Sequence, residues 1–206
     1  MEMGGEDLER WIKGDGDGKN KLPPEKVPII FSNMVEGVRF CHDNGYVHGD
    51  IQPKNFTLQL GGQEVVVLKL IDFGNAFNYT DSDTFTYPKC SLRYRPPEVF
   101  RAMVEEGPAY LGPPIDVWSL GIILYEMWNG DVRTNSLFEY NIPDDATGSI
   151  KLSSDILDTN GNVNNKMPGP FKELLINMLN IDAGKRITMD AGKRITDDMD
   201  DMDDIV

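Results

Sequence analysis

The sequence predicts an α+β fold that is mainly α-helical and contains one small β-hairpin. Three observations predict this class: an amphipathic segment at residues 29–42, a segment at 115–128 that is apolar almost all round, and a stretch at 56–74 that alternates in polarity around two glycines. The chain has 206 residues, of which 40% are hydrophobic and 26% are charged, so it can build one substantial core.

The first predicted elements are a short helix and a longer one. Leu8, Trp11 and Ile12 share one face of a helix over residues 6–13, which a Gly- and Pro-rich stretch brings to an end. Residues 29–42 are apolar at helical spacing, with a proline just before the first turn and Asn-Gly after the last. The second segment therefore predicts a solid amphipathic helix.

A β-hairpin is predicted after this helix. The stretch "FTLQLGGQEVVVLKLIDFG" (56–74) alternates between apolar and polar residues, turns at Gly61-Gly62 and alternates again. Residues 77–97 then carry polar residues and prolines without any period, which is typical of a long functional or mobile segment.

The C-terminal half is predicted to contain the spine of the core. The stretch "IDVWSLGIILYEMW" (115–128) reads as a helix that is buried on every side. Residues 129–169 indicate irregular structure with one short helix, and 171–178 a clean amphipathic helix with Pro170 in its first turn. The Asp-rich residues 197–206 predict a disordered acidic tail.

The charge and the cysteine content exclude several classes of function. The formal net charge is −14, which repels phosphate backbones and anionic lipids and so argues against nucleic-acid and membrane binding. The N-terminus is acidic, unlike a secretory signal, and the two cysteines have no metal-ligand spacing. We expect reduced thiols and a cytoplasmic or nuclear protein.

The stretch "VHGDIQPKN" (47–55) places an acid, Asp50, and an amide, Asn55, on a loop stiffened by a proline. Oxygen side chains on such a loop can hold a hard cation or accept a proton from a hydroxyl group. Asp, Asn, Gly and Pro are also ordinary turn residues. Taken alone, this stretch leaves both interpretations open.

The order of motifs along the chain resembles the C-terminal lobe of a eukaryotic protein kinase of the Ser/Thr type. "HGDIQPKN" (48–55) is similar to the catalytic loop of that family, and "DFG" (72–74) and "PPE" (96–98) to the two ends of its activation segment, 72–98. The resemblance covers residues 1–196. It implies a kinase-like C-terminal lobe.

The resemblance implies a role for each residue of the catalytic loop. Asp50 matches the acid that accepts or orients the proton of the substrate hydroxyl, and Gln52 stands where Ser/Thr kinases present a Lys to the transferred phosphate. Asn55 and Asp72 match the two ligands of Mg²⁺, so ATP and Mg²⁺ are the implied cofactors. An Asx-turn and a strand-end cap are the structural alternatives for these two residues.

The resemblance also implies supporting residues. Glu98 would pair with Arg186, and Asp116 would fix the catalytic loop from beneath or merely cap its own helix. His48 and Phe73 would support the site through packing or hydrogen bonding. Ser91 stands where Ser/Thr-directed kinases usually carry a Thr, which favours Ser or Thr over Tyr as the substrate.

The N-terminus resembles the hinge segment of the family, over residues 1–7. Met1, Glu2 and Met3 would meet the adenine, and Glu6 or Asp7 would lie near the ribose. A solvated acidic first turn is an equal alternative. Because nothing precedes this segment, we expect the N-terminal lobe to be absent, and with it the Gly-rich loop and the strand lysine.

Two further departures from the family pattern lie in the catalytic loop, and one repeat lies near the C-terminus. Gly49 replaces an Arg that pairs with a loop phosphate in many kinases, and the charge of the usual Lys is lost at Gln52. The heptapeptide "DAGKRIT" occurs twice, at 182–188 and 190–196, so Arg194 is an alternative partner for Glu98.

Three hypotheses follow from these observations. The chain is a protein kinase that transfers the ATP γ-phosphoryl group to Ser or Thr of a protein substrate, or a catalytically impaired lobe that binds protein partners, or a piece of a longer kinase. We expect weak or absent phosphotransfer from these 206 residues alone.

Overall fold

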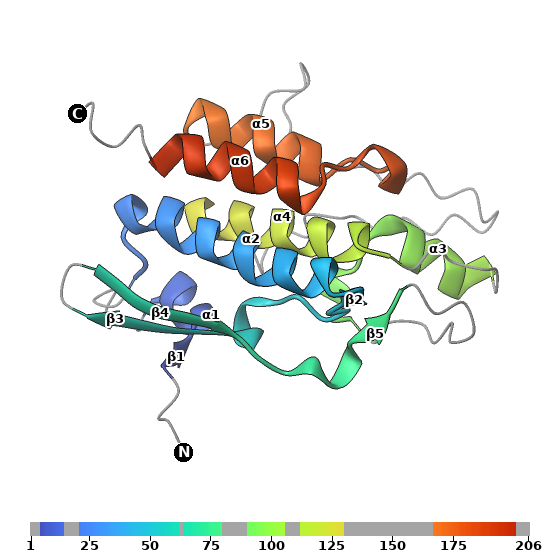
Figure 1. Ribbon diagram of the computed structural model, residues 1–206, viewed down its shortest axis with the longest axis horizontal. Helices are drawn as coiled ribbons and strands as arrows, with labels where there is room; N and C mark the ends of the chain where they lie inside the picture. Colours follow the sequence, from blue (N-terminus) through green and yellow to red (C-terminus); the bar gives the residue numbers. More distant parts are fainter. Residues whose placement is uncertain are drawn as a thin grey trace.

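The computed structural model of the protein is mainly α-helical, as predicted, and contains two small sheets where we predicted one hairpin (Figure 1). The structure describes residues 5–14, 21–61, 64–79, 90–105, 112–129 and 167–200. Within these residues, no helix is both long and apolar enough to cross a membrane. We predicted one short helix within residues 129–169, and most of this range, 130–166, lies outside the described residues.

Two helices lie side by side at the centre of the fold, α2 (Val27–Asp43) and α4 (Pro114–Asn129) (Figure 1). On one side they are covered by α5 (Gly169–Met178) and α6 (Met189–Asp200). On the other side β4 packs against α2. The central pair therefore connects the helical layer to the sheet that borders the catalytic-type loop.

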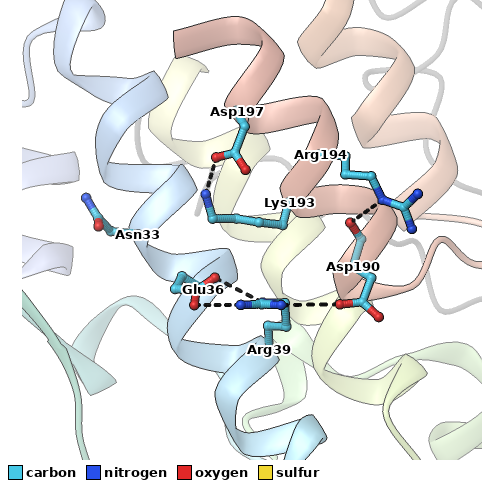
Figure 2. A pocket seen from close by; sticks show the side chains of 7 residues that line it. All are labelled: Asn33, Glu36, Arg39, Asp190, Lys193, Arg194 and Asp197. Atoms are coloured by element: carbon cyan, nitrogen blue, oxygen red, sulfur yellow. Dashed lines mark hydrogen bonds and ion pairs between the residues drawn. The ribbon is translucent and has the colours of Figure 1, made fainter. Parts of the chain in front are cut away.

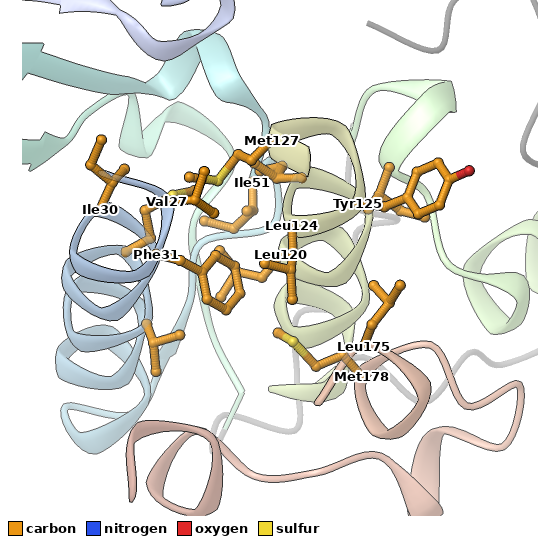
Figure 3. Packing of buried hydrophobic residues seen from close by; sticks show 14 of the residues in the cluster. Val27, Ile30, Phe31, Ile51, Leu120, Leu124, Tyr125, Met127, Leu175 and Met178 are labelled. Atoms are coloured by element: carbon orange, nitrogen blue, oxygen red, sulfur yellow. The ribbon is translucent and has the colours of Figure 1, made fainter. Parts of the chain in front are cut away.

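The helix α4 is the spine that its sequence predicts, since every residue from Ile115 to Met127 is buried. Figure 3 shows Phe31 pointing from α2 toward Leu120 on α4, with Leu175 on α5 close by. Full burial of such a side chain contributes about 1.5–3 kcal/mol. A rigid α4 follows from this packing on all sides.

A glycine allows α4 to approach the end of α5 closely. A Cβ atom at Gly121 would lie 2.8 Å from Cδ2 of Leu179 and 3.0 Å from Cβ of Met178. No side chain larger than hydrogen fits this contact without a shift of its neighbours.

The predicted hairpin is present and forms part of a three-stranded antiparallel sheet. Its strands are β3 (Phe56–Gly61) and β4 (Glu64–Leu70), paired from Phe56 opposite Leu70. The short strand β1 (Glu6–Asp7) adds to the outer edge of β3. Directly after β1, Asp7 caps the helix α1 (Leu8–Lys13) by accepting the N–H of Arg10.

A second sheet ties the residues before the catalytic-type loop to the residues after "DFG". It pairs β2 (Tyr46–Val47) with β5 (Phe77–Asn78) in antiparallel fashion. The tripeptides Pro53–Asn55 and Phe73–Asn75 form 3-10 turns that lead into β3 and toward β5. Each motif is thus anchored to a strand.

Two helices differ from the sequence prediction. The helix α3 (Pro97–Glu105) begins at the "PPE" motif, within a region for which we predicted no element. The helix α6 extends to Asp200, so the acidic tail expected at 197–206 starts inside a helix. The packing of the preceding part of α6 provides the reason, because Met189 is buried and Ile195 packs against the main core.

A charged groove of about 570 Å³ lies between α2 and α6 (Figure 2). Arg39 makes two hydrogen bonds to Glu36, at 2.8 and 3.0 Å, and reaches Asp190 at 3.5 Å. Lys193 pairs with Asp197 one turn further along α6. The ion pair between Arg39 and Asp190 joins the two helices, whereas the pairs of Arg39 with Glu36 and of Lys193 with Asp197 lie within one helix each.

Candidate active site

The loop from His48 to Asn55 carries the candidate site, and Gly49 shapes it. Gly49 has a φ of 75°, in the left-handed region, and a Cβ atom there would lie 2.8 Å from the carbonyl oxygen of Asn75. Any side chain at this position meets both backbone strain and a clash. The absence of an Arg at Gly49 thus has a local structural cause.

Asp116 holds this loop from the buried end of α4. Its Oδ2 accepts the backbone N–H of His48 at 2.8 Å, and its Oδ1 accepts that of Gly49 at 3.0 Å. Nε2 of His42 lies 3.0 Å from Oδ2. The side chain of Asp116 is 0% exposed, so these hydrogen bonds are what satisfies a buried carboxylate.

His48 connects the loop to the end of β4. Its Nε2 lies 3.1 Å from the carbonyl oxygen of Ile71, and its Nδ1 lies 3.3 Å from the backbone N–H of Asp50. A carbonyl only accepts and an N–H only donates, so both contacts fit the neutral tautomer protonated at Nε2. The ring meets Phe73 edge-on, at 4.9 Å between centroids. Phe73 itself is 52% exposed.

The carboxylate of Asp50 is almost buried and receives four N–H donors. Oδ1 accepts from the backbone N–H of Ser91 at 3.2 Å. Oδ2 accepts from the side-chain amides of Gln52 at 3.0 Å, Asn75 at 3.4 Å and Asn55 at 3.5 Å. We call these three amides the amide cradle. Among the described residues, no Lys or Arg pairs with Asp50.

Asn55 and Asp72 lie next to each other across the end of the hairpin. The backbone carbonyl of Asn55 accepts the N–H of Ile71 at 2.8 Å, and Asp72 follows directly. Nδ2 of Asn55 donates to the carbonyl of Asp50 at 2.8 Å, which leaves Oδ1 as its free acceptor among the described residues. Sequence reasoning had not placed the backbone of Asn55 in this contact.

Asp72 has an unusual backbone conformation. Its φ is 63° and its ψ is 68°, and it is the one non-glycine residue with positive φ among the described residues. Such a conformation costs about 1–3 kcal/mol and is typical of functional sites. Its exposed carboxylate accepts the N–H of Gly74 at 3.3 Å.

The donor set of Asn55 and Asp72 suits a magnesium ion. Carboxylate and amide oxygens are hard ligands, and Mg²⁺ usually takes few of them from the protein and the rest from water and phosphate. The described residues contain no cluster of three or more His, Cys, Asp or Glu side chains around a point. The donor set is therefore that of a site in which phosphate and water supply the remaining ligands.

The segment before "PPE" is fastened to α4 by a polar cluster that sequence reasoning missed. The hydroxyl of Tyr94 donates to Oε2 of the buried Glu126 at 2.9 Å, and Arg93 lies 2.5 Å from Oε1. Ser119 donates to the carbonyl of Tyr94 at 2.8 Å. Burial and the carboxylate of Glu126 raise the pKa of Tyr94, so its hydroxyl stays a donor. Ser91 is thereby held near Asp50.

Glu98 and Arg186 form a two-point ion pair, with N–O distances of 2.5 and 2.7 Å. Arg186 also donates to the carbonyl of Pro114 at 3.0 Å, and its guanidinium lies 4.8 Å from the ring of Trp118. Arg194, in the second copy of the heptapeptide, is exposed and donates to the carbonyl of Asp190 instead. The first copy therefore supplies the partner of Glu98.

The hinge-like segment is described only in part. Met1, Glu2 and Met3 lie outside the described residues. Glu6 is exposed on β1 and pairs with Arg10 at 2.7 Å. Its role toward a nucleotide stays a prediction.

Comparison with known proteins identifies relatives along most of the chain. The family described as "Protein kinase domain" matches residues 1–195. Because this match starts at residue 1, it does not confirm the expectation that an N-terminal lobe is absent.

Two curated relatives are similar in sequence. The carbon catabolite-derepressing protein kinase of Secale cereale is 33% identical over 172 residues, which cover 83% of this chain and 30% of the relative. Cyclin-dependent kinase B2-1 of Oryza sativa subsp. japonica is 31% identical over 122 residues, 59% of this chain and 35% of the relative. The chain thus spans about a third of their length.

One solved structure shares the fold. It is described as the crystal structure of the yeast RNA Pol II CTD kinase CTDK-1 complex, and it superposes with a TM-score of 0.68 at 20% sequence identity. The match covers 91% of this chain and 66% of that one. At this identity the likeness concerns the fold alone.

Proposed function

The chain belongs to the protein kinase family, and we propose that its function is to transfer the γ-phosphoryl group of ATP to Ser or Thr hydroxyls of a protein. The observation that carries this proposal is the position of three oxygen-bearing side chains. Asp50, Asn55 and Asp72 come from two segments that the backbone contact between Asn55 and Ile71 holds together. Phosphoryl transfer requires such positioning more than covalent chemistry.

Asp50 would orient the substrate hydroxyl, and the hydrogen bonds around it indicate the atom. Oδ2 already accepts three amide donors, whereas Oδ1 accepts only the N–H of Ser91 among the described residues. A carboxylate oxygen has two lone pairs. We therefore assign the hydroxyl contact to Oδ1, which would accept its proton as the oxygen attacks.

Asn55 and Asp72 would hold Mg²⁺ through Oδ1 of the amide and the exposed carboxylate. Bound there, the ion neutralises phosphate charge. Asn55 is fixed for this role because its Nδ2 donates to the carbonyl of Asp50. The left-handed backbone of Asp72 sets the direction of its carboxylate.

We further propose that the described residues correspond to the C-terminal lobe of the kinase domain. The catalytic-type loop, the "DFG" turn and the helix that begins at "PPE" support this assignment, as does the ion pair between Glu98 and Arg186. The substrate would be a protein. The two free thiols, Cys41 and Cys90, fit a reducing cytoplasmic or nuclear compartment.

A second function is favoured by one observation, the neutral side chain of Gln52. Its amide donates to Asp50 at 3.0 Å and offers no positive charge to a transferred phosphate. Loss of one such donor typically costs about 100- to 1,000-fold in rate. A lobe that binds protein partners and transfers no phosphate is therefore the competing proposal.

Phosphate transfer to a Ser/Thr peptide library, measured with labelled ATP, distinguishes the two. We expect slow transfer by the wild type and none by Asp50→Asn. Gln52→Lys should raise the rate by about 10- to 100-fold, because it restores the missing charge. If neither the wild type nor Gln52→Lys transfers phosphate, while both bind the nucleotide with Mg²⁺, the scaffold function is the correct one.

A further inference from the structure

Asn75 contacts the site although nothing in the sequence singled it out. It is the last residue of the 3-10 turn Phe73–Asn75, and its Nδ2 donates to Oδ2 of Asp50 at 3.4 Å. The other two amides of the cradle, Gln52 and Asn55, belong to the same loop as Asp50. Asn75 alone brings a donor from the segment that carries Asp72.

With the contact of Asn75, residues on both sides of Asp72 are held by hydrogen bonds. On one side, the N–H of Ile71 donates to Asn55 at 2.8 Å, and its carbonyl accepts from His48 at 3.1 Å. On the other side, Asn75 reaches Asp50. Asp72 has a strained left-handed backbone that persists only where its surroundings hold it. Contacts on both sides supply that restraint.

The backbone of Asn75 also packs directly on the loop that carries Asp50. A Cβ atom at Gly49 would lie 2.8 Å from the Asn75 carbonyl oxygen. The two segments are therefore in contact through the backbone as well as through the hydrogen bond from Asn75 to Asp50.

The donors to Asp50 are all uncharged, which raises the importance of each. Among the described residues, no ion pair includes Asp50. A hydrogen bond from a neutral N–H to a carboxylate is strengthened by the charge of its acceptor, but less than one in which the donor is also charged. A carboxylate held by neutral amides alone therefore depends on the full set for its orientation.

From these contacts we propose that Asn75 is a positioning residue of the phosphoryl-transfer site. It fixes Asp72, which would bind the cation, relative to Asp50, which would orient the hydroxyl. Its relevance to the reaction rests on the proposed function. The contact between Asn75 and Asp50 can be measured without any substrate.

Steady-state kinetics test the role in the reaction, in a protein that keeps Gln52 and with it the other amide donors to Asp50. Asn75→Leu, which keeps the branched side-chain shape and has no donor, should lower kcat by about 3- to 10-fold. KM for the peptide should change by less than about 2-fold, because the loss concerns positioning in the transition state. Asn75→Gln should recover part of the rate.

The control is Asn33→Leu. The amide of Asn33 donates to the carbonyl of Ile29 within α2, away from the site, at 2.8 Å. This variant should keep kcat and KM. A cooperative thermal unfolding transition shows that each Leu variant is folded. If both are folded and have equal kcat and KM, the proposal is overturned.

A spectrum of the side-chain amides tests the contact itself. In ¹⁵N-labelled protein, Asp50→Asn should shift the Nδ2 resonances of Asn75 and leave those of Asn33 in place. Unmoved Asn75 resonances overturn the proposal, even if Asn75→Leu fails to fold. If the wild type and Gln52→Lys transfer no phosphate but the Asn75 resonances shift, the proposed function fails while the coupling of the two segments stands.

Discussion

The carboxylate of Asp116 accepts the backbone N–H of His48 at 2.8 Å, across 68 residues of sequence. The same carboxylate accepts the N–H of Gly49, so two successive amides of the catalytic-type loop end on one buried side chain. Asp116 is part of α4, which is buried on every side. The loop that carries Asp50 is therefore anchored to the most rigid part of the core.

Replacing Asp116 by Asn should destabilise the protein strongly. An amide places an N–H group against a backbone N–H and loses one acceptor inside the core, which costs about 2–4 kcal/mol. The free energy of unfolding in urea measures this loss. Asp182→Asn is the control, because Asp182 is an exposed cap and Asn caps equally well. Similar effects of the two changes would contradict the anchoring role.

The two copies of "DAGKRIT" give a matched comparison of two arginines. Arg186 is buried in its ion pair with Glu98, and Arg194 is exposed on α6. Arg186→Ala should lower the free energy of unfolding by about 3–5 kcal/mol, because it leaves a carboxylate without its partner. Arg194→Ala should change it by less than about 0.5 kcal/mol. Urea unfolding of both variants checks this, and a larger effect at Arg194 would refute the assignment.

Two glycines should respond in opposite directions to alanine. Gly49→Ala forces a left-handed residue and a clash with Asn75, at a cost of at least about 1–2 kcal/mol. Gly192 lies within α6, where the nearest atom to a new Cβ is 4.0 Å away, so Gly192→Ala should stabilise by about 0.5–1 kcal/mol. Thermal unfolding gives both signs, and the same sign for both would contradict the backbone geometry.

The groove between α2 and α6 should make stability depend on pH at the acid end. The hydrogen bonds from Arg39 lower the pKa of Glu36 below its ordinary value of 4.5. A lowered pKa in the folded state stabilises the fold at higher pH, and this contribution disappears as the pH falls through the folded-state pKa. The effect is small, since Glu36 is partly exposed.

The measurement for this groove is the difference in unfolding free energy between the wild type and Glu36→Gln. It should be constant near neutral pH and decrease below about pH 4.5. Salt should reduce it as well, because the pair lies at the surface. A difference that stays constant down to pH 3 would exclude the ion pair as its cause.

The sequence predicts the main helices and the hairpin because their periods are strong and local. The all-round apolar pattern of 115–128 has one interpretation, a buried helix, and α4 confirms it. The pairing of β3 with β4 likewise follows from alternation around Gly61-Gly62. A helix or hairpin whose own residues follow a clear period can thus be predicted without knowing its tertiary contacts.

The two "DAGKRIT" copies show where local sequence stops being informative. The first forms a 3-10 turn at Ala183–Lys185, and the second lies within the helix α6. Identical residues cannot encode this difference, so contacts with α2 and Glu98 decide it. The last four residues of α6, 197–200, belong to the stretch for which we predicted an acidic tail.

The candidate site was predictable where its residues belong to a motif of the family, and not elsewhere. Asp50, Asn55 and Asp72 stand out because their motifs resemble those of a family. Asn75 and Glu126 act through contacts with distant segments, and no period or motif marks them in the sequence.

The most direct test of the account is the binding of ATP to the full chain, by calorimetry, with and without Mg²⁺. Asp72→Asn is the matched variant, since Asn tolerates the left-handed backbone and removes only the charge. We predict Mg²⁺-dependent binding by the wild type and at least about 10-fold weaker binding by Asp72→Asn. Equal ATP affinities of the two proteins, or an ATP affinity that does not change with Mg²⁺, would contradict a metal site formed by Asn55, Asp72 and the nucleotide.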